Sequence, residues 1–212
     1  MDKAIVYGSG GHGKVVLDIL LESGFEVMGF VDDNKNQLGS VINGYPVLGD
    51  GSYLENKKKI KVALGIGCNS ARENILHKLT TSNAEIISAI HPKAVISREV
   101  RLGKGIVIMA GAVVNPSTVI EDGVVVNTGA TVDHDCHLAA FSHLWPGAHL
   151  AGSVYVGERS YIGMGAAVIQ NIKIGRDVKI GAGAVVISDI PDNATAVGVP
   201  AKCVHGEKQH AK

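Results

Sequence analysis

The chain has 212 residues, a formal net charge of zero, and aromatic side chains at only 4% of its positions. This length suits one large or two small domains, and the balanced charge provides no basic surface for nucleic acid. The N-terminus lacks the apolar stretch of a signal peptide, no apolar run reaches the roughly 20 residues of a membrane span, and the three scattered cysteines are typical of reduced thiols, so we expect a cytoplasmic protein without a membrane span.

Short apolar runs alternate with helical patterns in the first 91 residues. Strands are predicted at residues 3–8, 26–34, 59–67 and 84–92, and helices at 15–23, 49–58 and 69–82. Residues 35–46 are predicted to form a polar loop. Strands that alternate with helices favour a small parallel sheet, so we expect a Rossmann-like α/β domain over residues 1–91.

A glycine-rich motif follows the first predicted strand and begins the first predicted helix. It reads Gly8-x-Gly10-x-x-Gly13. The acids Asp32 and Asp33 follow about 20 residues later, at the end of the second predicted strand. Such glycines let the backbone approach phosphates at a helix N-terminus. The motif therefore predicts phosphate binding, and a tight strand-to-helix turn without a ligand is the alternative.

The identity of the nucleotide is open at this point. An NAD-type site would use Asp32 on a ribose hydroxyl, whereas a nucleotide-sugar site would place Asp32 or Asp33 against the base or the ribose. In the second case, His12 and Lys14 would lie close to the phosphates. The chain shows no separate substrate domain to complete a dehydrogenase, which favours the nucleotide sugar.

From Ala94 to Asp189 the sequence divides without a gap into sixteen blocks of six residues. The third residue of every block is aliphatic, from Ile96 to Val186, and the first is small or aliphatic. A fixed period of six predicts a parallel β-helix. An α-helix is excluded because six steps of about 100° do not return to the same face.

In this β-helix, each block forms one short strand and one tight bend, with its first and third residues pointing inward. Three blocks close a coil, so residues eighteen apart stack in register, and sixteen blocks make a little over five coils. A β-sandwich of short strands would instead have irregular turns at about 8–12-residue spacing.

The repeat contains four histidines within 16 residues: His134, His137, His143 and His149. His134 precedes Asp135 and follows inward Val132 by two residues, so we expect it at a corner, facing outward. It is either a solvated surface residue or a general base oriented by the neighbouring carboxylate. Metal binding by His134 and His137 is disfavoured because residues three apart lie on different sides of the three-sided coil.

The stacking rule places Gly152 one coil beyond His134, because the two residues are eighteen apart. A glycine amide at this place would donate a hydrogen bond to an oxygen that develops negative charge beside the base. The spacing therefore predicts a base and an oxyanion donor on one corner. Cys136 falls in the inward register and is a poor candidate for a nucleophile.

The chain resembles the hexapeptide-repeat acyltransferases that modify bacterial nucleotide sugars, and among them the PglD, PerB and NeuD group. The resemblance covers almost the whole chain and rests on YGSGGHGKVV (7–16), FVDDN (30–34), HPKAVIS (91–97), VVNTGATVDHDC (125–136), FSHLWPGAHLAG (141–152), IGMGA (162–166) and GVPAK (198–202). We therefore expect an N-terminal Rossmann-like α/β domain at 1–91, a left-handed parallel β-helix at 92–190, and a C-terminal segment and tail at 191–212.

The resemblance implies acetyl-CoA as the acetyl donor, no metal, and a UDP- or GDP-linked amino sugar as the acceptor. The implied reaction is N-acetylation of the 4-amino group in bacterial surface-glycan biosynthesis. It also implies a homotrimer whose CoA groove lies between the β-helices of adjacent subunits. No long loop interrupts the sixteen blocks, so bare coils would have to form that groove.

The resemblance also assigns roles to individual residues. The family's catalytic base matches His134, with Asp135 as the acid beside it. The implied contacts with acetyl-CoA are His143, Gly152, Met164 and Ala182. The implied contacts with the nucleotide sugar are Gly10, His12, Asp32, Asp33, Gly65, Ile66 and Asn127.

Three other functions stay open at the level of sequence. O-acetylation of a sialic-acid-like sugar would use the same base on a hydroxyl group. A Rossmann-type oxidoreductase is disfavoured by the β-helix. A non-catalytic sugar-binding scaffold is disfavoured by His134 and Asp135 beside Asn127.

Overall fold

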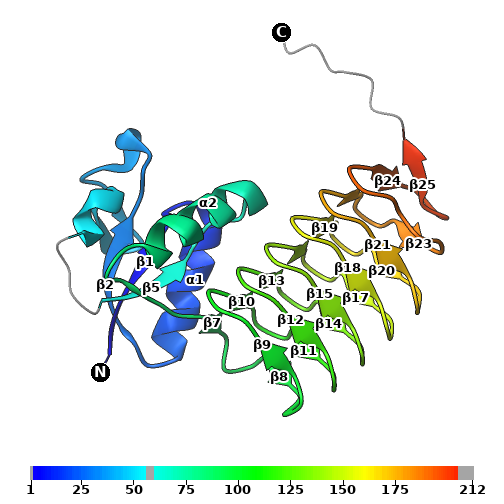
Figure 1. Cartoon of the computed structure of the whole chain (residues 1–212). Helices are drawn as coiled ribbons and strands as arrows, with labels where there is room; N and C mark the ends of the chain where they lie inside the picture. The colour runs from blue at the N-terminus through cyan, green and yellow to red at the C-terminus, as the bar shows by residue number, and fades with distance from the viewer. Residues whose placement is uncertain (1, 56–59, 205–212) are drawn as a thin grey trace, which may run out of the picture.

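The computed structural model describes residues 2–55 and 60–204, and the predicted C-terminal tail at 205–212 lies outside these residues. An α/β domain is followed by a coil of short parallel strands that extends away from it (Figure 1). The expected combination of an α/β domain and a parallel β-helix is therefore confirmed. Within the described ranges, no helix has the length and apolar character needed to cross a membrane.

The α/β domain is built on a six-stranded sheet in the order β3-β4-β2-β1-β5-β6. Its strands are parallel except for the β3–β4 hairpin. The elements are β1 (Lys3–Tyr7), α1 (Gly11–Glu22), β2 (Glu26–Val31), the 3₁₀ helix η1 (Lys35–Gln37), β3 (Val41–Ile42), β4 (Tyr45–Gly49), the 3₁₀ helix η2 (Gly51–Leu54), β5 (Lys61–Leu64), α2 (Asn69–Thr80) and β6 (Glu85–Ile86).

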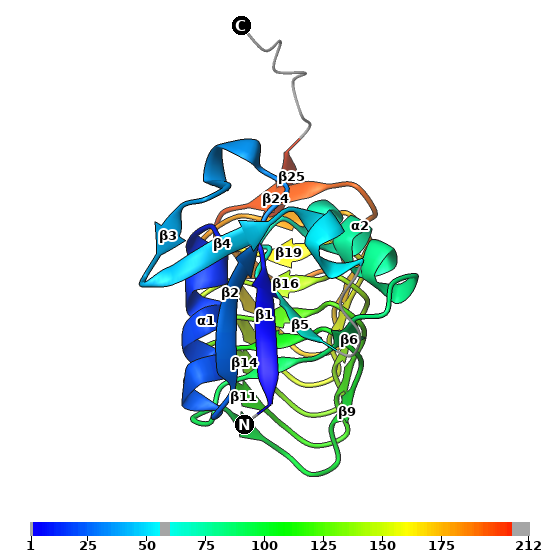
Figure 2. The same cartoon turned by 90° about the vertical axis from the view of Figure 1, so that its left-hand side faces the viewer.

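The two long helices cover opposite faces of this sheet (Figure 2). Successive side chains of a strand point to opposite faces, so Ala4 and Val6 of β1 pack with α1, whereas Ile5 and Tyr7 pack with α2. This arrangement places the N-terminal end of each helix beside the carboxyl ends of the parallel strands, where ligands of such sheets bind.

Three sequence predictions need correction in this domain. The strand expected at 84–92 divides into β6, which pairs with β5, and β7 (Ala89–Ile90), which pairs with β10 (Val107–Ile108) of the coil. A single apolar run does not reveal that its two ends pair in different sheets. The loop expected at 35–46 contains η1 and β3, and the short helix expected at 49–58 is the single turn η2, with residues 56–59 outside the described range.

Three walls of stacked strands form the coil. The first wall holds β7, β10, β13 (Val125–Val126), β16 (His143–Leu144), β19 (Tyr161–Ile162), β22 (Lys179–Ile180), β24 (Thr195–Val197) and β25 (Lys202–Val204). The second wall holds β8 (Val95–Ile96), β11 (Val113–Val114), β14 (Thr131–Val132), β17 (His149–Leu150), β20 (Ala167–Val168) and β23 (Val185–Val186). The third wall holds β9 (Arg101–Leu102), β12 (Val119–Ile120), β15 (His137–Leu138), β18 (Tyr155–Val156) and β21 (Lys173–Ile174).

The predicted register is confirmed, because residues eighteen apart pair along each wall, as Thr131 does with His149. The third residues of the blocks from Ile108 to Val186 are at most 2% exposed. Leu102 has the same place in its block but is 40% exposed, because β9 ends its sheet and no described strand pairs with its outer edge. Stacking of neighbouring coils, rather than the sequence pattern alone, therefore buries the core.

We number the bends between the walls. The first corner joins the first wall to the second, the second corner joins the second to the third, and the third corner joins the third to the first. The last residue of every block from Gly105 to Gly183 has a φ between 54° and 70°. Glycine adopts this left-handed conformation freely, whereas a bulky residue is strained in it.

Two bulky residues occupy such left-handed positions on the third corner, and both contact the α/β domain. Phe141 packs into the core beside α2, and Arg159 forms an ion pair with Glu73 of α2. On the first wall, Val107 and Val125 share a core with Val16 and Leu20 of α1. The α/β domain is therefore fixed to the first wall and the third corner, and it leaves the second wall uncovered.

Two serines occupy inward positions of the coil, and their environments differ. The Ser160 hydroxyl donates to the Gly175 carbonyl at 2.6 Å and accepts from the Val178 amide at 2.8 Å. The equally buried Ser142 hydroxyl has no hydrogen-bond partner among the described residues. A buried polar group without a partner is costly, whereas a paired one leaves its partners unsatisfied when it is removed.

We therefore predict opposite effects for two matched substitutions. Ser142→Ala should leave the melting temperature unchanged or raise it, because it removes an unpaired hydroxyl. Ser160→Ala should destabilise the fold by about 1–3 kcal/mol, because two buried backbone groups lose their partner. Thermal unfolding of the two variants beside the wild type measures this difference. Equal losses of stability in both variants would contradict the assigned hydrogen bonds.

Candidate active site

His134 lies on the second corner, in the bend between β14 and β15, as expected. Its Nδ1 is 2.8 Å from Asp135 Oδ2, and the side chain is 59% exposed. The Asp133 carboxylate accepts from the backbone N–H of His134 at 2.8 Å and thereby holds the bend. With Nδ1–H donated to Asp135, the Nε2 lone pair is left free to accept a proton.

The carboxylates around His134 also strengthen it as a base. The hydrogen bond to Asp135 raises the pKa of the His134 imidazole above its ordinary value, and the charge of Asp133 adds to this effect. A higher pKa gives the neutral ring a stronger pull on a proton, which suits a general base that works near neutral pH.

Gly152 lies directly against the His134 ring, as the stacking rule predicts. A Cβ atom on Gly152 would be only 2.6 Å from His134 Cε1 and 2.8 Å from Nε2, so the ring occupies the space that a side chain would need. Within residues 2–55 and 60–204, the Gly152 N–H has no hydrogen-bond acceptor, while its carbonyl accepts from Asn171. A free amide donor therefore lies beside the His134 imidazole.

A second group of expected site residues lies around a cavity of about 490 Å³ between α1, the loop after β5, and the first corner. His12, Asn127, His143 and Met164 all line this cavity. Ala182 stacks one coil beyond Met164, because the Gly183 amide donates to the Met164 carbonyl at 2.7 Å. The structure therefore brings Asn127, an implied contact of the acceptor sugar, close to His143 and Met164, two implied contacts of acetyl-CoA.

The two histidines of this cavity are held neutral. The His12 and His143 rings meet edge to face with their centroids 5.9 Å apart. Burial lowers the pKa of His143 to about 3 and that of His12 to about 4, and the nearby Arg72 cation contributes to both shifts. The Nε2 atom of His12 is buried and has no hydrogen-bond partner among the described residues. His12 therefore lines the cavity as a neutral group with an unpaired ring nitrogen.

The glycine-rich motif forms the turn that the sequence predicts. Gly8 has a φ of 104°, and a Cβ atom on Gly13 would lie 1.9 Å from the Gly8 carbonyl, so both positions require glycine. Gly10 caps α1 without a side-chain hydrogen bond, which leaves the helix N-terminus open toward solvent. This geometry fits a phosphate group at the start of α1.

The two predicted acids have different partners. Asp32 accepts hydrogen bonds from the Ser9 amide at 2.7 Å and the Ser9 hydroxyl at 2.6 Å, so it holds the glycine-rich turn in place. Asp33 is exposed, accepts from the Tyr7 hydroxyl at 2.9 Å, and lines a separate hollow of about 700 Å³ between η2 and α2.

Gly65 and Ile66 directly follow β5. The Gly65 amide donates to the Tyr7 carbonyl at 2.7 Å, which places this loop beside the glycine-rich turn. All of the implied nucleotide-sugar contacts except Asn127 therefore lie at the carboxyl ends of β1, β2 and β5 or in the first turn of α1.

One chain does not bring the two halves of the candidate site together. His134, Asp135 and Gly152 lie on the second corner, whereas Asn127, Met164 and Ala182 lie on the first. The second wall separates the two corners, and its strand β14 lies between Asn127 and His134 along the chain. At about 3.3 Å per residue, this wall puts the two backbones roughly 15–20 Å apart.

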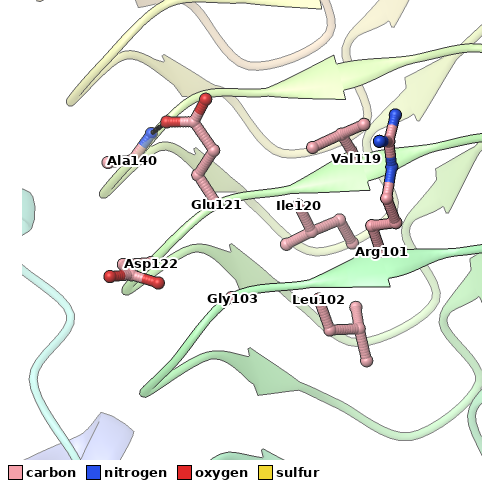
Figure 3. Close-up of a pocket in the computed structure, with 8 residues that line it drawn as sticks. All are labelled: Arg101, Leu102, Gly103, Val119, Ile120, Glu121, Asp122 and Ala140. Carbon is pink, nitrogen blue, oxygen red and sulfur yellow. Dashed lines mark hydrogen bonds between the residues drawn. The ribbon is translucent and has the colours of Figure 1, made fainter.

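A further hollow of about 400 Å³ lies at the start of the coil, between β9, β12 and the third corner (Figure 3). Glu121 lines it and accepts a hydrogen bond from the Ala140 amide at 3.0 Å. None of the expected site residues lines this hollow. Among the described residues, no group of three or more His, Cys, Asp or Glu is arranged to bind a metal ion.

Sequence reasoning missed three residues that shape the cavity. Trp145 lines it with its ring 5.6 Å from that of His143, and Gly67 contributes its backbone. Arg72 lies behind it, fully buried, and bonds to the Gly67 carbonyl at 3.1 Å. One signal was available: Arg72 falls on the apolar stripe of α2 that contains Ile75, Leu76 and Leu79.

Comparison with known proteins gives two family matches. Residues 3–79 match the model of the PglD N-terminal domain, and residues 153–188 match that of the bacterial transferase hexapeptide with six repeats. Among curated proteins, the UDP-N-acetylbacillosamine N-acetyltransferase of Bacillus subtilis is 34% identical over 113 residues, which are 52% of each chain. The chain thus spans about half or less of the length of the first two curated relatives.

Two solved structures are similar over nearly the full length. The acetyltransferase domain of PglB from Neisseria gonorrhoeae, in complex with acetyl coenzyme A, is 43% identical, with a TM-score of 0.90 over 95% of this chain and 98% of that one. PerB from Caulobacter crescentus, in complex with CoA and GDP-perosamine, is 40% identical, with a TM-score of 0.91 over 97% of this chain and 98% of that one.

The contact between Gly152 and His134 yields a test of the second corner. Gly152→Ala should push the exposed imidazole away from its place without disturbing the buried core. We expect a nearly unchanged melting temperature and a loss of about 100-fold in turnover, the size expected for a misplaced catalytic group. Thermal unfolding and steady-state kinetics measure the two effects. Full turnover in this variant would show that Gly152 and His134 do not belong to the active site.

Proposed function

This chain belongs to the sugar acetyltransferases that join a PglD N-terminal domain to bacterial transferase hexapeptide repeats, and we propose that it transfers an acetyl group from acetyl-CoA to a nucleotide-linked amino sugar. The acceptor in this proposal is the 4-amino group of a UDP- or GDP-linked sugar. The observation that carries the proposal is the His134–Asp135 pair stacked against a free Gly152 amide.

His134 is the proposed general base. With its Nδ1–H held by Asp135, the Nε2 atom accepts a proton from the acceptor amine as that amine attacks the thioester carbonyl. A new C–N bond forms, the C–S bond breaks, and the CoA thiolate leaves. The transfer is direct, and Cys136 takes no part, because it is buried in the core and burial raises the pKa of its thiol.

Gly152 is the proposed oxyanion donor. Its N–H donates to the thioester oxygen as that oxygen gains negative charge in the transition state. The donor is a backbone group fixed by the stacked coils, so it needs no rearrangement during the reaction. Base and oxyanion donor lie on the same corner. This fits the reaction, because the amine that gives up its proton lies close to the carbonyl oxygen that gains negative charge.

The first corner fits the long arm of CoA. A Cβ atom at Gly147, Gly165 or Gly183 would meet no atom within 4 Å, so this edge of the coil is open. Met164, at 51% exposure, provides apolar surface beside it. In the proposal, Met164 and Ala182 contact the adenine and pantetheine groups, and His143 contacts the arm near the acetyl group.

The α/β domain is the proposed site of the nucleotide sugar. Gly10 and His12 would approach the diphosphate at the start of α1, while Asp32, Asp33, Gly65 and Ile66 would surround the ribose and base. Asn127 would meet the sugar, because it lies on the first corner beside His12 and His143. The open N-terminus of α1 supports this placement.

A homotrimer is part of the proposal. The second wall separates His134 from the cavity of its own chain, so the base must meet the first corner of a neighbouring subunit. A three-fold arrangement of parallel coils achieves this, because each second corner then faces the next subunit's first corner. The uncovered second wall supports the same arrangement. Acceptor and donor would bind between subunits in the cytoplasm, in the synthesis of a bacterial surface glycan.

An acceptor panel tests the proposed activity. We expect thiol release from acetyl-CoA with UDP- or GDP-linked 4-amino sugars. His134→Ala should lower kcat by about 10²–10⁴-fold, the usual contribution of a general base, while CoA still binds. Activity on sialic acid alone would favour O-acetylation, and no activity on any acceptor would contradict the proposal. Near-normal turnover of His134→Ala would remove that residue as the base.

The Asp135 carboxylate yields a prediction about pH. A general base works in its neutral form, so kcat/KM rises with pH through the pKa of His134. Asp135→Asn replaces the charged acceptor that raises this pKa with a neutral amide, so the acidic limb of the profile should move to lower pH. The plateau should also fall, because a weaker base accepts a proton less readily. An acidic limb that stays in place would show that Asp135 does not control the pKa of the proposed base.

A further inference from the structure

The Arg72 side chain is the largest fully buried side chain of the described residues. It extends from α2 into the junction between the α/β domain and the coil. Its three nitrogens donate to five oxygens: Gly123 O at 2.6 Å, Asn69 Oδ1 and Phe141 O at 2.9 Å, Ile66 O at 3.0 Å, and Gly67 O at 3.1 Å. These five bonds use the full donor capacity of a guanidinium group.

This arrangement is unusual for a buried cation. Arg72 forms no ion pair with any described residue, and neutral oxygens accept all five of its N–H hydrogen bonds. Burial lowers the pKa of Arg72 to about 10, which still leaves it charged at neutral pH. An apolar residue would bury this face of α2 without desolvating a charge. Packing alone therefore does not explain an arginine at this place.

One of its five acceptors leads to the candidate site. The Gly67 carbonyl, held by Arg72, is also 3.4 Å from His143 Nδ1. A carbonyl only accepts, so the contact at Nδ1 requires the proton to be on that nitrogen. In a neutral imidazole, Nε2 then carries the lone pair.

The other side of His143 agrees with this tautomer. Asn127 Oδ1 accepts from the Thr128 amide at 2.8 Å, which turns the Asn127 Nδ2 group toward His143 Nε2 at 3.2 Å. Nδ2 only donates, so Nε2 must accept. The opposite tautomer would set two donors against each other. Asn127 thus donates to His143, and His143 donates to the Gly67 carbonyl, which also accepts from Arg72.

We propose that Arg72 is a positioning residue, which acts through the Gly67 carbonyl to hold His143 in its Nδ1–H tautomer and so keeps the second N–H of Asn127 available to a ligand in the cavity. This inference rests on the proposed function for the meaning of that cavity. Asn127 Nδ2 carries two hydrogens, and His143 uses one of them. The other is left for an oxygen of the acceptor sugar or of the acetyl group.

The same guanidinium connects the two substrate regions. Ile66 and Gly67 belong to the loop implied to bind the nucleotide base, whereas Gly123 and Phe141 are bends of the coil. Arg72 therefore fixes the distance between the loop at Ile66 and Gly67 and the His143 imidazole, which contacts the CoA arm near the acetyl group in the proposed function. Loss of this residue should raise the KM for the nucleotide sugar more than the KM for acetyl-CoA. Among the implied CoA contacts, His143 is joined to Arg72 through the Gly67 carbonyl, whereas Met164 and Ala182 lie on the first corner and form no hydrogen bond with Arg72.

The first test is the tautomer itself. Nitrogen NMR of the ¹⁵N-histidine-labelled protein, with His143→Gln used to assign the signal, should show His143 neutral, protonated at Nδ1 and bare at Nε2. A ring protonated at Nε2 in the wild type would overturn the proposal. This readout does not depend on activity. If the wild type acetylates no acceptor, the proposed function fails while the tautomer stays measurable.

The second test compares two arginines that both fix α2 to the coil. Arg72→Lys keeps the charge but not the five-donor fork. We expect a fall in kcat of about 10–100-fold, the size expected when a group that positions the substrates is displaced, with a larger rise in the KM for the nucleotide sugar than in the KM for acetyl-CoA. The control is Arg159→Ala, which breaks the ion pairs with Glu73 and Asp177 but leaves the Gly67 carbonyl untouched. It should lower the melting temperature and leave the three kinetic values within about 2-fold of wild type.

Equal kinetics in Arg72→Lys and Arg159→Ala would overturn the proposal, because both would then act only on domain docking. If Arg72→Lys does not fold, Asn127→Asp tests the proposal instead. This substitution replaces the donor opposite Nε2 of His143 by an acceptor. With the Gly67 carbonyl still accepting from Nδ1, both ring nitrogens of His143 should become protonated near neutral pH. A neutral ring protonated only at Nε2 would show that Gly67 exerts no hold on it.

Discussion

The strand pairing that stacks residues eighteen apart determines where each chemical group of the coil lies. From Ile106 to Val186, it puts the first and third residues of the blocks inside the coil and the fifth residues on the corners. Gly152 meets His134 for this reason alone, because the two residues have the same place in blocks one coil apart. A single inserted residue between them would move the glycine away from the His134 ring. The regular coil thus aligns the His134 imidazole with the Gly152 amide, the proposed base and the proposed oxyanion donor.

Docking of the α/β domain then gives two histidines of the same repeat opposite properties. His143 lies on the covered first wall, where burial and the Arg72 cation keep it neutral. His134 lies on the uncovered second corner, where carboxylates raise its pKa. His143 is thus a fixed, neutral hydrogen-bonding group, whereas His134 has the properties of the proposed base. The difference arises from the wall or corner that each occupies, and both residues have the same intrinsic chemistry.

Much of this fold follows from the sequence, because a period of six with aliphatic third positions leaves few alternatives. The wall and corner of His134, Gly152 and Cys136 could be predicted from block arithmetic. The division of residues 84–92 between two sheets could not, since pairing partners are set by tertiary contacts. Arg72 was also missed, because an arginine in a helix normally extends to solvent, and its partners are backbone carbonyls that no residue pattern encodes.

The separation of His134 from Asn127 within one chain is the feature whose consequence is most easily measured. His134→Ala and Asn127→Ala, each nearly inactive alone, are co-expressed with different affinity tags, and the mixed oligomers are purified through both tags. If each site of a trimer takes its base from one subunit and its Asn127 from the next, every mixed trimer contains one intact site, so about a third of wild-type activity should return in the doubly purified oligomers. Mixed oligomers that stay as inactive as the separate variants would place the whole site within one chain.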